Sequence, residues 1–295
     1  VVGVKAEDVN GNAYTFTATK GVILATGGFA ANGSMIAEYN TDDKWAATDL
    51  SKVKTTNRYG CSQGDGITMA LAAGADLTQM EQIQLLYLGN TKDGSLTKYP
   101  PRCVNGTDQE IFINKNGERF VQEDGRRDVI CLAVLSQPDS MFYFLESADG
   151  DYTDIATAIS ADGFTFQYLE EQGYIVVADT LDEMAEKLGM DAETLKATVD
   201  AFNASVESGV DEFGRTLFSV QLTNGPWVAT ARTACLHHTM GGVHIDTACR
   251  VLNAEGTAIK GLYAAGEVTG GIHGGNRLGG NAVVDTVVFG KLAGE

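Results

Sequence analysis

The residues that could do chemistry are concentrated near the C-terminal end of the sequence. Between positions 261 and 282, repeated glycines surround one acidic residue, Glu267, and one arginine, Arg277. Backbone N–H groups in such a loop, and at the start of a following helix, can bind a phosphate or a ring carbonyl. The Glu267 carboxylate can accept hydrogen bonds from the hydroxyl groups of a sugar or ribityl chain. One Gly-Gly pair would indicate a tight turn, but this many glycines around an acid and an arginine indicate a ligand site.

Three shorter motifs suit the same kind of site. Residues 25–28 (ATGG) end the apolar run 21–25, and a helix is predicted from about Asn32. Strand, glycine turn and helix is the geometry of a nucleotide-binding α/β layer. Residues 64–66 (GDG) open a second predicted helix, and residues 237–242 (HHTMGG) place two histidines before two glycines.

The composition excludes several classes of function. The 295 residues include 39 acidic and 21 basic ones, which gives a formal net charge of −18. Such a chain repels nucleic-acid backbones and anionic lipid headgroups. No apolar stretch reaches the roughly 18 residues that a membrane span needs. The five cysteines form no CxxC pair and are odd in number, so we expect buried or free thiols and neither a metal site nor a disulfide framework.

The order of the predicted elements indicates an α/β domain with an α+β insertion. Strands are expected at 1–6, 14–19, 21–25 and 75–80, with helices from about 32 and at 66–74. Short strands at 111–113 and 142–145 and a helix near 128–135 follow. A capping box at Thr180 and a cap at Asp191 predict two further helices, and a strand is expected at 242–247. We therefore expect a nucleotide-binding domain from residues 1–85 and 227–295, interrupted by residues 86–226.

These motifs, in this order, resemble the FAD-dependent fumarate-reductase-like flavoproteins. This family includes soluble fumarate reductases, urocanate reductases and related enoate reductases and, more distantly, 3-ketosteroid dehydrogenases. The resemblance also covers residues 114–128 (NKNGERFVQEDGRRD) and the helix expected from Asp191. It implies a Rossmann-like FAD-binding domain interrupted by a capping domain.

The resemblance also assigns the cofactor-binding residues. They are Ala25, Thr26, Gly27, Gly28, Asp65, Gly66, His238, Gly266, Glu267, Arg277, Gly279, Gly280, Asn281 and Ala282. The GxGxxG unit that holds the FAD pyrophosphate does not occur in residues 1–295. The sequence also begins in a predicted strand, without a targeting segment. We therefore expect an N-terminally truncated FAD-binding domain that binds FAD weakly by itself, and the compartment stays open.

By the same resemblance, Arg127, His237 and Arg277 carry the catalysis. His237 and Arg277 match the pair that holds one substrate carboxylate. Arg127 matches the arginine that protonates the substrate, and the neighbouring Arg126 is a rival for this role. Simpler interpretations remain for two of them: Arg127 could be a helix-start arginine paired with Glu123, and His237 could be a core histidine.

The other three histidines have less defined roles. His238 is first read as structural or flavin-facing. His273, among glycines, lies near the flavin or serves packing, and His244 is read as an ordinary strand residue.

Two departures from the family pattern bear on the substrate. Leu86 stands where the fumarate reductases carry a histidine for the second carboxylate. Residues 99–105 (YPPRCVN) replace their Thr-Glu-x-x-Arg stretch, although Arg102 could supply a new anion contact. We therefore expect a substrate with one carboxylate and an apolar or aromatic tail near Leu85, Leu86 and Tyr87.

The resulting hypothesis is a flavoprotein oxidoreductase that reduces the C=C bond of an α,β-unsaturated carboxylate other than fumarate. Reduced FAD would deliver hydride from N5, and an arginine would supply the proton. The electron donor would be a haem, FMN or quinol-linked module outside these residues. The alternatives are a fumarate reductase with an altered second carboxylate pocket, a 3-ketosteroid-dehydrogenase-like enzyme and a non-catalytic flavin electron carrier.

Overall fold

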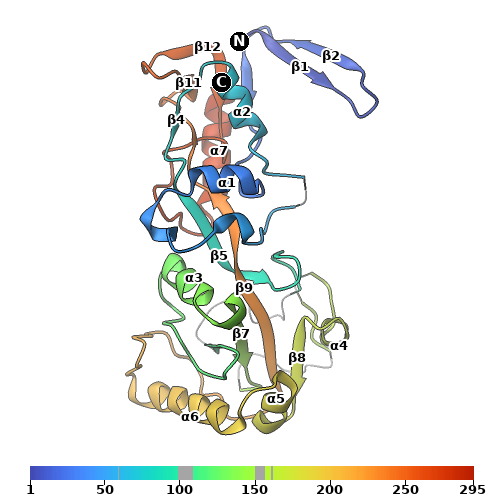
Figure 1. Ribbon diagram of the computed structural model, residues 1–295, viewed down its shortest axis with the longest axis vertical. Helices are drawn as coiled ribbons and strands as arrows, with labels where there is room; N and C mark the ends of the chain where they lie inside the picture. Colours follow the sequence, from blue (N-terminus) through green and yellow to red (C-terminus); the bar gives the residue numbers. More distant parts are fainter. Residues whose placement is uncertain (59, 99–108, 150–156, 161) are drawn as a thin grey trace. The chain divides into compact units, whose positions relative to one another are not determined.

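The computed structural model describes residues 1–58, 60–98, 109–149, 157–160 and 162–295. The chain forms two compact units, residues 1–84 with 236–295 and residues 85–235. It passes from the first to the second within strand β5 (Ile83–Asn90) and returns within strand β9 (Trp227–Thr239) (Figure 1). The boundary expected at 226 therefore lies just before a strand that continues without a break to Thr239. The predicted α/β class is confirmed.

A small mixed sheet forms the centre of the first unit. Its described strands run in the order β11 (Arg250–Leu252), β12 (Ala258–Ala264) and β3 (Val22–Leu24). Strands β12 and β3 are parallel, with Ala264 opposite Leu24, whereas β11 is antiparallel to β12. Because parallel strands end at the same edge of a sheet, the glycine loops that follow Leu24 and Ala264 begin side by side.

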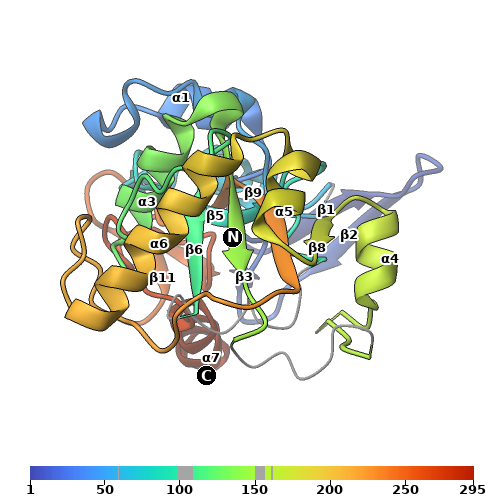
Figure 2. The ribbon, with the colours of Figure 1, turned by 90° about the horizontal axis from the view of Figure 1, so that it is seen from below.

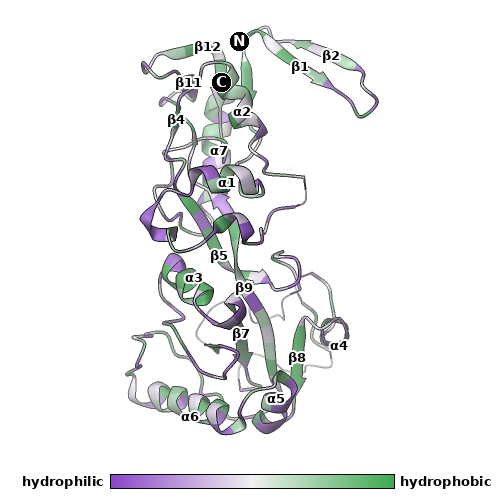
Figure 3. Ribbon diagram, viewed as in Figure 1, coloured by the Kyte–Doolittle hydropathy of each residue, from purple (hydrophilic) through white to green (hydrophobic). Residues whose placement is uncertain are grey.

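Three helices of the first unit surround these loops. Helix α1 (Gly33–Tyr39) begins after Asn32, whose side chain accepts from the N–H groups of Ser34 and Met35. Helix α2 (Asp65–Ala72) and helix α7 (Asn281–Gly294) both begin directly after a glycine. Helix α7 contains many hydrophobic residues (Figure 3), and its exposed apolar side chains include Val283, Val284, Val287 and Val288. The predicted helix starts near 32 and 65 are confirmed.

Strand predictions in this unit succeed for the hairpin and fail in two other places. Strands β1 (Gly3–Glu7) and β2 (Ala13–Thr17) lie where strands were expected at 1–6 and 14–19, and they form an antiparallel hairpin with Gly3 opposite Thr17. The strand expected at 75–80 is reduced to β4 (Leu77–Thr78), and the one expected at 242–247 to β10 (Gly242–Val243). These two segments pair with each other over two residues, so the alternating pattern of 242–247 does not continue as a ladder.

The second unit is built on a sheet that has five strands in the described residues. Strands β5, β9, β7 (Met141–Glu146) and β6 (Glu110–Ile113) follow in that order, and β8 (Ile175–Ala178) also pairs with β9. Strand β9 is antiparallel to both β7 and β8. The predicted strands near 111–113 and 142–145 are confirmed.

Helices α5 (Leu181–Leu188) and α6 (Ala192–Ser208) cover this sheet, and Figure 2 shows them in front of its strands. Their buried Met184, Leu195 and Phe202 share one hydrophobic core with Ile111 and Leu145 of the sheet. Both helices begin at the predicted caps, because Thr180 accepts from Glu183 N and Asp191 from Thr194 N. The remaining described helices are α3 (Arg127–Leu135), α4 (Phe166–Glu171) and the 3-10 turns Asp43–Trp45, Leu50–Lys52 and Pro138–Ser140.

Two further sequence expectations concern the membrane and the cysteines. Among the described residues, no helix has both the length and the apolar character needed to cross a bilayer. Cys131, Cys235 and Cys249 are buried and Cys61 is exposed, all four as free thiols. Cys103 lies outside the described residues.

Candidate active site

The turn after β3 brings Gly28 against two side chains from distant parts of the sequence. A Cβ atom at Gly28 would lie 2.1 Å from Thr239 Oγ1 and 2.6 Å from Glu267 Oε1, so a larger residue does not fit. Gly27 has a φ of +78°, a conformation that favours glycine. Its Cβ would meet Ser62 Oγ at 3.9 Å, so the side of the turn at Gly27 is open.

The second glycine motif packs against the first. A Cβ atom at Gly66 would lie 1.9 Å from Thr26 Oγ1. The Gly64 N–H group also donates to the Gly28 carbonyl oxygen at 3.0 Å. The motifs at 25–28 and 64–66, which the sequence separates by more than thirty residues, therefore form one surface.

Glu267 is the charged centre of this surface. Its carboxylate accepts hydrogen bonds from Thr239 N at 3.0 Å and Thr239 Oγ1 at 3.3 Å, and lies 3.2 Å from Nδ1 of the buried His238. Burial opposes ionisation, but the contacts with His238 and Thr239 outweigh it and lower the pKa of Glu267 below its ordinary value of 4.5. The Glu267 side chain is therefore a carboxylate at neutral pH.

This lowered pKa predicts a pH-dependent contribution to stability. The contribution of ionised Glu267 is fully present above pH 4.5 and is lost as the pH falls through the lower pKa of the folded state. Replacing Glu267 by Gln should lower the free energy of unfolding at pH 7 by about 1.5–3 kcal/mol, and this difference should shrink below pH 4.5. Urea unfolding of both forms across this range measures it, with Glu255→Gln in an exposed turn as the control. A difference that does not change with pH would contradict the assignment.

The loop from 266 to 280 ends at the first turn of α7. Gly266 and Gly280 have φ values of +79° and +83°, and Gly280 caps the helix through its backbone conformation. No described atom lies within 4 Å of a Cβ built on Gly280. The N–H groups of the first helical turn and this open space together suit an anionic or carbonyl group. Gly279 and Asn281 beside them are exposed, as are Ala25, Thr26 and Asp65, and Ala282 is half-buried.

Arg277 is held inside this loop. Its side chain is buried, and Nη1 donates to the Leu278 carbonyl oxygen at 3.1 Å. The loop backbone is fixed by Gln84, whose Nε2 donates to the Arg277 carbonyl oxygen at 2.9 Å, and by Lys44, whose Nζ donates to the Gly275 carbonyl oxygen at 2.8 Å. A buried guanidinium in a loop with a fixed backbone can bind a carboxylate in one defined orientation.

The histidines differ in their surroundings. His237 is half-buried, and its Nδ1 lies 2.7 Å from Thr56 Oγ1, which fixes the ring. His273 Nε2 lies 3.1 Å from Asp285 Oδ2. Burial lowers the pKa of His273 despite this carboxylate, so its ring is neutral at pH 7. His244 lies just beyond β10, 3.0 Å from Asp76, so its assignment to a strand was wrong.

Arg127 and Arg126 belong to the second unit, where α3 begins. Arg127 is the first residue of the helix and is half-buried. The Arg126 side chain is 72% exposed and binds Asp128 at 2.8 Å. Glu123, the partner considered for Arg127, is bound by Arg119 at 2.7 Å. The two arginines therefore lie in different environments, which the sequence did not distinguish.

The geometry of strand β5 contradicts the expectation that Leu85, Leu86 and Tyr87 form one surface for a substrate tail. Successive side chains of a strand point to opposite faces, so Leu86 lies opposite Leu85 and Tyr87. The ring of Tyr87 packs against Phe112 and Phe142, with centroid distances of 5.6 and 6.4 Å. Burial also raises the pKa of Tyr87 to about 12. Leu85, Leu86 and Tyr87 therefore do not share one face, and Arg102 with residues 99–105 lies outside the described residues.

Several residues of the site were not predicted. Gln84 and Lys44 fix the arginine loop, Thr239 binds Glu267, and Thr56 binds His237. A polar Gln84 inside the apolar stretch of β5 is the one local signal that could have identified such a role. The others depend on contacts between distant segments.

The chain matches the FAD binding domain family over residues 1–283. It belongs to this FAD-binding family. An NADH:acrylate oxidoreductase from Vibrio harveyi is 42% identical over 299 residues, which cover 100% of this chain and 28% of the relative. A urocanate reductase from Eggerthella lenta is 37% identical over 297 residues, 100% of this chain and 47% of the relative.

A solved structure agrees with this chain in both fold and sequence. The open conformation of a flavocytochrome c3 fumarate reductase has a TM-score of 0.73 and 34% identity, covering 100% of this chain and 48% of that one. The chain thus spans less than half the length of each of these three relatives. The resemblance to fumarate-reductase-like flavoproteins is confirmed.

FAD is the cofactor of this family, and the first unit has residues that fit it. The buried Nε2 atom of His238 has no hydrogen-bond partner among the described residues, as expected for an atom that contacts a bound group. The backbone is open at Gly27 and Gly280, where side chains would otherwise stand. Gly27, His238, Glu267 and the first turn of α7 would therefore hold the FAD.

Proposed function

We propose that the protein is an FAD-dependent reductase of the C=C bond of an α,β-unsaturated carboxylate. The observation that carries this proposal is Arg277, a buried cation in the same loop as the glycines that are proposed to bind the cofactor. Gln84 fixes the backbone of Arg277 at 2.9 Å. A cation held at this place suits a small anionic substrate bound beside the cofactor.

The side chains of this chain have distinct tasks in such a reaction. Arg277 and His237 hold one carboxylate of the substrate, and the guanidinium draws electron density from the conjugated double bond. FAD, when bound and reduced, would supply the hydride for the β carbon. Arg127 donates a proton to the α carbon. An arginine, with a pKa above about 12, can do so because the developing carbanion is far more basic and a proton relay can restore its charge.

The proposal also covers the substrate class and the electron donor. Leu86, in place of a histidine, suits a substrate with one carboxylate. The names of the relatives include acrylate, urocanate and fumarate as substrates, so the choice of a substrate other than fumarate rests on Leu86. The donor is proposed to be a haem, FMN or quinol-linked module outside residues 1–295. The relatives' names differ here, since one includes NADH and another a flavocytochrome.

The decisive test is anaerobic turnover of the protein in its full natural length. Its flavin is reduced by a dye donor, and unsaturated monocarboxylates are then added. We expect stoichiometric flavin reoxidation, followed in the visible spectrum, with the saturated acid as product.

The alternatives give different results in this assay. A bound flavin that stays reduced with every acid would indicate an electron carrier. In a parallel experiment that starts from oxidised flavin, oxidation of a 3-ketosteroid with concomitant flavin reduction would indicate a 3-ketosteroid-dehydrogenase-like enzyme. Reoxidation by fumarate in preference to monocarboxylates would indicate a fumarate reductase.

A further inference from the structure

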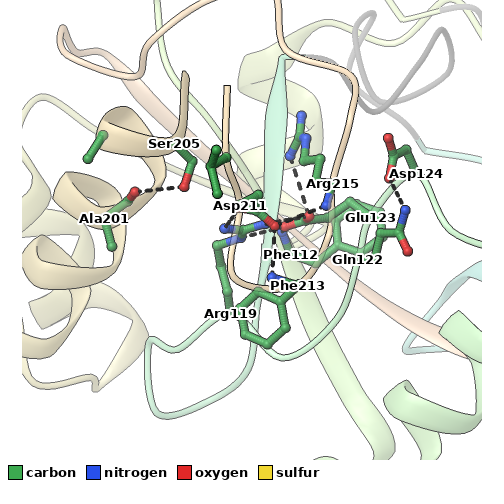
Figure 4. A network of polar contacts seen from close by, with 12 residues as sticks. Phe112, Arg119, Gln122, Glu123, Asp124, Ala201, Ser205, Asp211, Phe213 and Arg215 are labelled. Carbon is green, nitrogen blue, oxygen red and sulfur yellow. Dashed lines mark hydrogen bonds and ion pairs between the residues drawn. The ribbon is translucent and has the colours of Figure 1, made fainter. Parts of the chain in front are cut away.

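A buried ion network in the second unit lies directly before the helix that begins with Arg127. It consists of Arg119, Glu123, Asp211 and Arg215, whose side chains are at most 3% exposed. Figure 4 shows these residues converging from the loop after β6 and from the segment after α6. The sequence separates Arg119 from Asp211 by 92 positions.

Arg119 joins the two segments through a bidentate contact on each side. Its Nε and Nη2 donate to Glu123 at 2.8 and 2.7 Å. Its Nη1 and Nη2 donate to Asp211 at 2.6 and 3.2 Å. The planar guanidinium has enough donors, at fixed angles, for both carboxylates. A lysine would keep the charge but could not make both contacts.

Glu123, Asp211 and Arg215 also form hydrogen bonds with backbone groups on both sides of the Arg119 guanidinium. Glu123 also accepts from Phe112 N of β6 at 3.3 Å. Asp211 accepts from the N–H groups of Phe213 and Arg215 at 3.0 and 3.2 Å. Arg215 Nη1 donates to the Glu110 carbonyl oxygen at 2.6 Å. The network is thus attached to the sheet as well as to both segments.

Asp124, which follows Glu123 in the sequence, makes further hydrogen bonds on the side of the network toward Arg127. Asp124 accepts from Thr216 N, Thr216 Oγ1 and Leu217 N at 2.8, 2.8 and 3.0 Å. A tight turn follows, in which Gly125 N donates to the Gln122 carbonyl oxygen at 3.1 Å. Only Gly125 and Arg126 then separate the anchored Asp124 from Arg127. The network and Asp124 therefore hold the segment that leads into the first turn of α3.

Stability alone does not explain such a network. An apolar core of similar volume often stabilises a fold as well as a buried ion group does, whereas ionic contacts fix one geometry. We infer that Arg119, Glu123, Asp211 and Arg215 are positioning residues, which hold the loop 119–124 so that Arg127 is placed to donate its proton. This inference rests on the proposed function of Arg127.

Arg119→Lys tests it in the full-length, flavin-loaded protein, with activity normalised to bound flavin. We expect kcat for an unsaturated carboxylate to fall between about ten- and a hundred-fold, with KM changed less than about twofold, because His237 and Arg277 are untouched. The solvent deuterium isotope effect on kcat should rise, since misplacement slows the proton step. Amide hydrogen exchange over residues 125–131 should become faster. Asp211→Asn should act in the same way.

Asp149→Asn is the matched control. Asp149 also joins two segments of the second unit, accepting from Asn224 N at 2.7 Å and Thr223 Oγ1 at 3.0 Å, but it does not adjoin α3. We expect it to lower the melting temperature without changing kcat or the isotope effect. Equal kinetic losses in both variants, or a lower melting temperature of Arg119→Lys with unchanged kcat and isotope effect, would overturn the inference.

Hydrogen exchange separates this inference from the proposed function. If the wild-type protein reduces no unsaturated carboxylate, the proposed function fails, yet exchange over 125–131 still measures the anchoring. Faster exchange in Arg119→Lys but not in Asp149→Asn would then support the anchor. Exchange equal to that of the wild type would overturn it.

Discussion

Replacing Arg127 by alanine is expected to lower turnover by about 10²- to 10⁴-fold, the usual effect of losing one well-placed proton donor. The same change at Arg126 should cost much less. Arg127 is half-buried at the first position of α3, whereas the Arg126 side chain is 72% exposed and already bound to Asp128 at 2.8 Å. A donor to a substrate carbon must be shielded from bulk water and held in place, and Arg127 meets both conditions better.

The measurement is steady-state reduction of an unsaturated carboxylate by the full-length protein, together with reduction of its flavin by dithionite. Both variants should retain flavin and reduce it normally. If Arg126→Ala causes the larger loss, the proton-donor role passes to Arg126. If Arg127→Ala also loses its flavin, the effect belongs to folding or cofactor binding and not to proton transfer.

Features that depend on local sequence could be predicted. The predicted caps at Thr180 and Asp191 each bind an N–H group three residues ahead, so a short segment contains all the information. The helix expected from about Asn32 also begins at a local cap, since Asn32 binds N–H groups two and three residues ahead. The hairpin β1–β2 has its turn signal at residues 10–12. The glycine motifs were found because glycine is required where a Cβ atom would collide, as at Gly28 and Gly66.

Features that depend on distant contacts could not be predicted. Arg119 and Asp211 were visible as charged residues, but no local pattern joins two positions 92 residues apart. The pairing of His238 with Glu267 is of the same kind. The prediction of a strand over 242–247 was wrong. The sequence pattern alternates along the whole segment, but β10 pairs with β4 over only two residues. The expected tail surface grouped Leu85, Leu86 and Tyr87 because they are adjacent in the sequence. In a strand, however, adjacent side chains point to opposite faces of the sheet.

Fumarate is expected to be a much poorer substrate than an unsaturated acid with one carboxylate. Leu86 is 9% exposed, and the family resemblance implies that it stands where the fumarate reductases carry a histidine for the second carboxylate. A second charge without a hydrogen-bond partner in a dry pocket costs several kcal/mol, and each 1.4 kcal/mol is a factor of about ten in affinity. The kcat/KM for fumarate should therefore be at least about 100-fold below that for an aryl- or alkyl-substituted acrylate.

A panel of acids assayed anaerobically with the full-length protein measures this ratio, and Leu86→His provides the matched variant. Because Leu86 lies on the face of β5 opposite to Tyr87, this change leaves the packing of Tyr87 against Phe112 intact. The histidine should raise kcat/KM for fumarate relative to the monocarboxylates, since it restores a donor for the second charge. If the wild-type protein prefers fumarate, or if Leu86→His leaves the ratio unchanged, Leu86 does not face the substrate. The single-carboxylate assignment would then lose its basis, while Arg277 and His237 would still require one carboxylate.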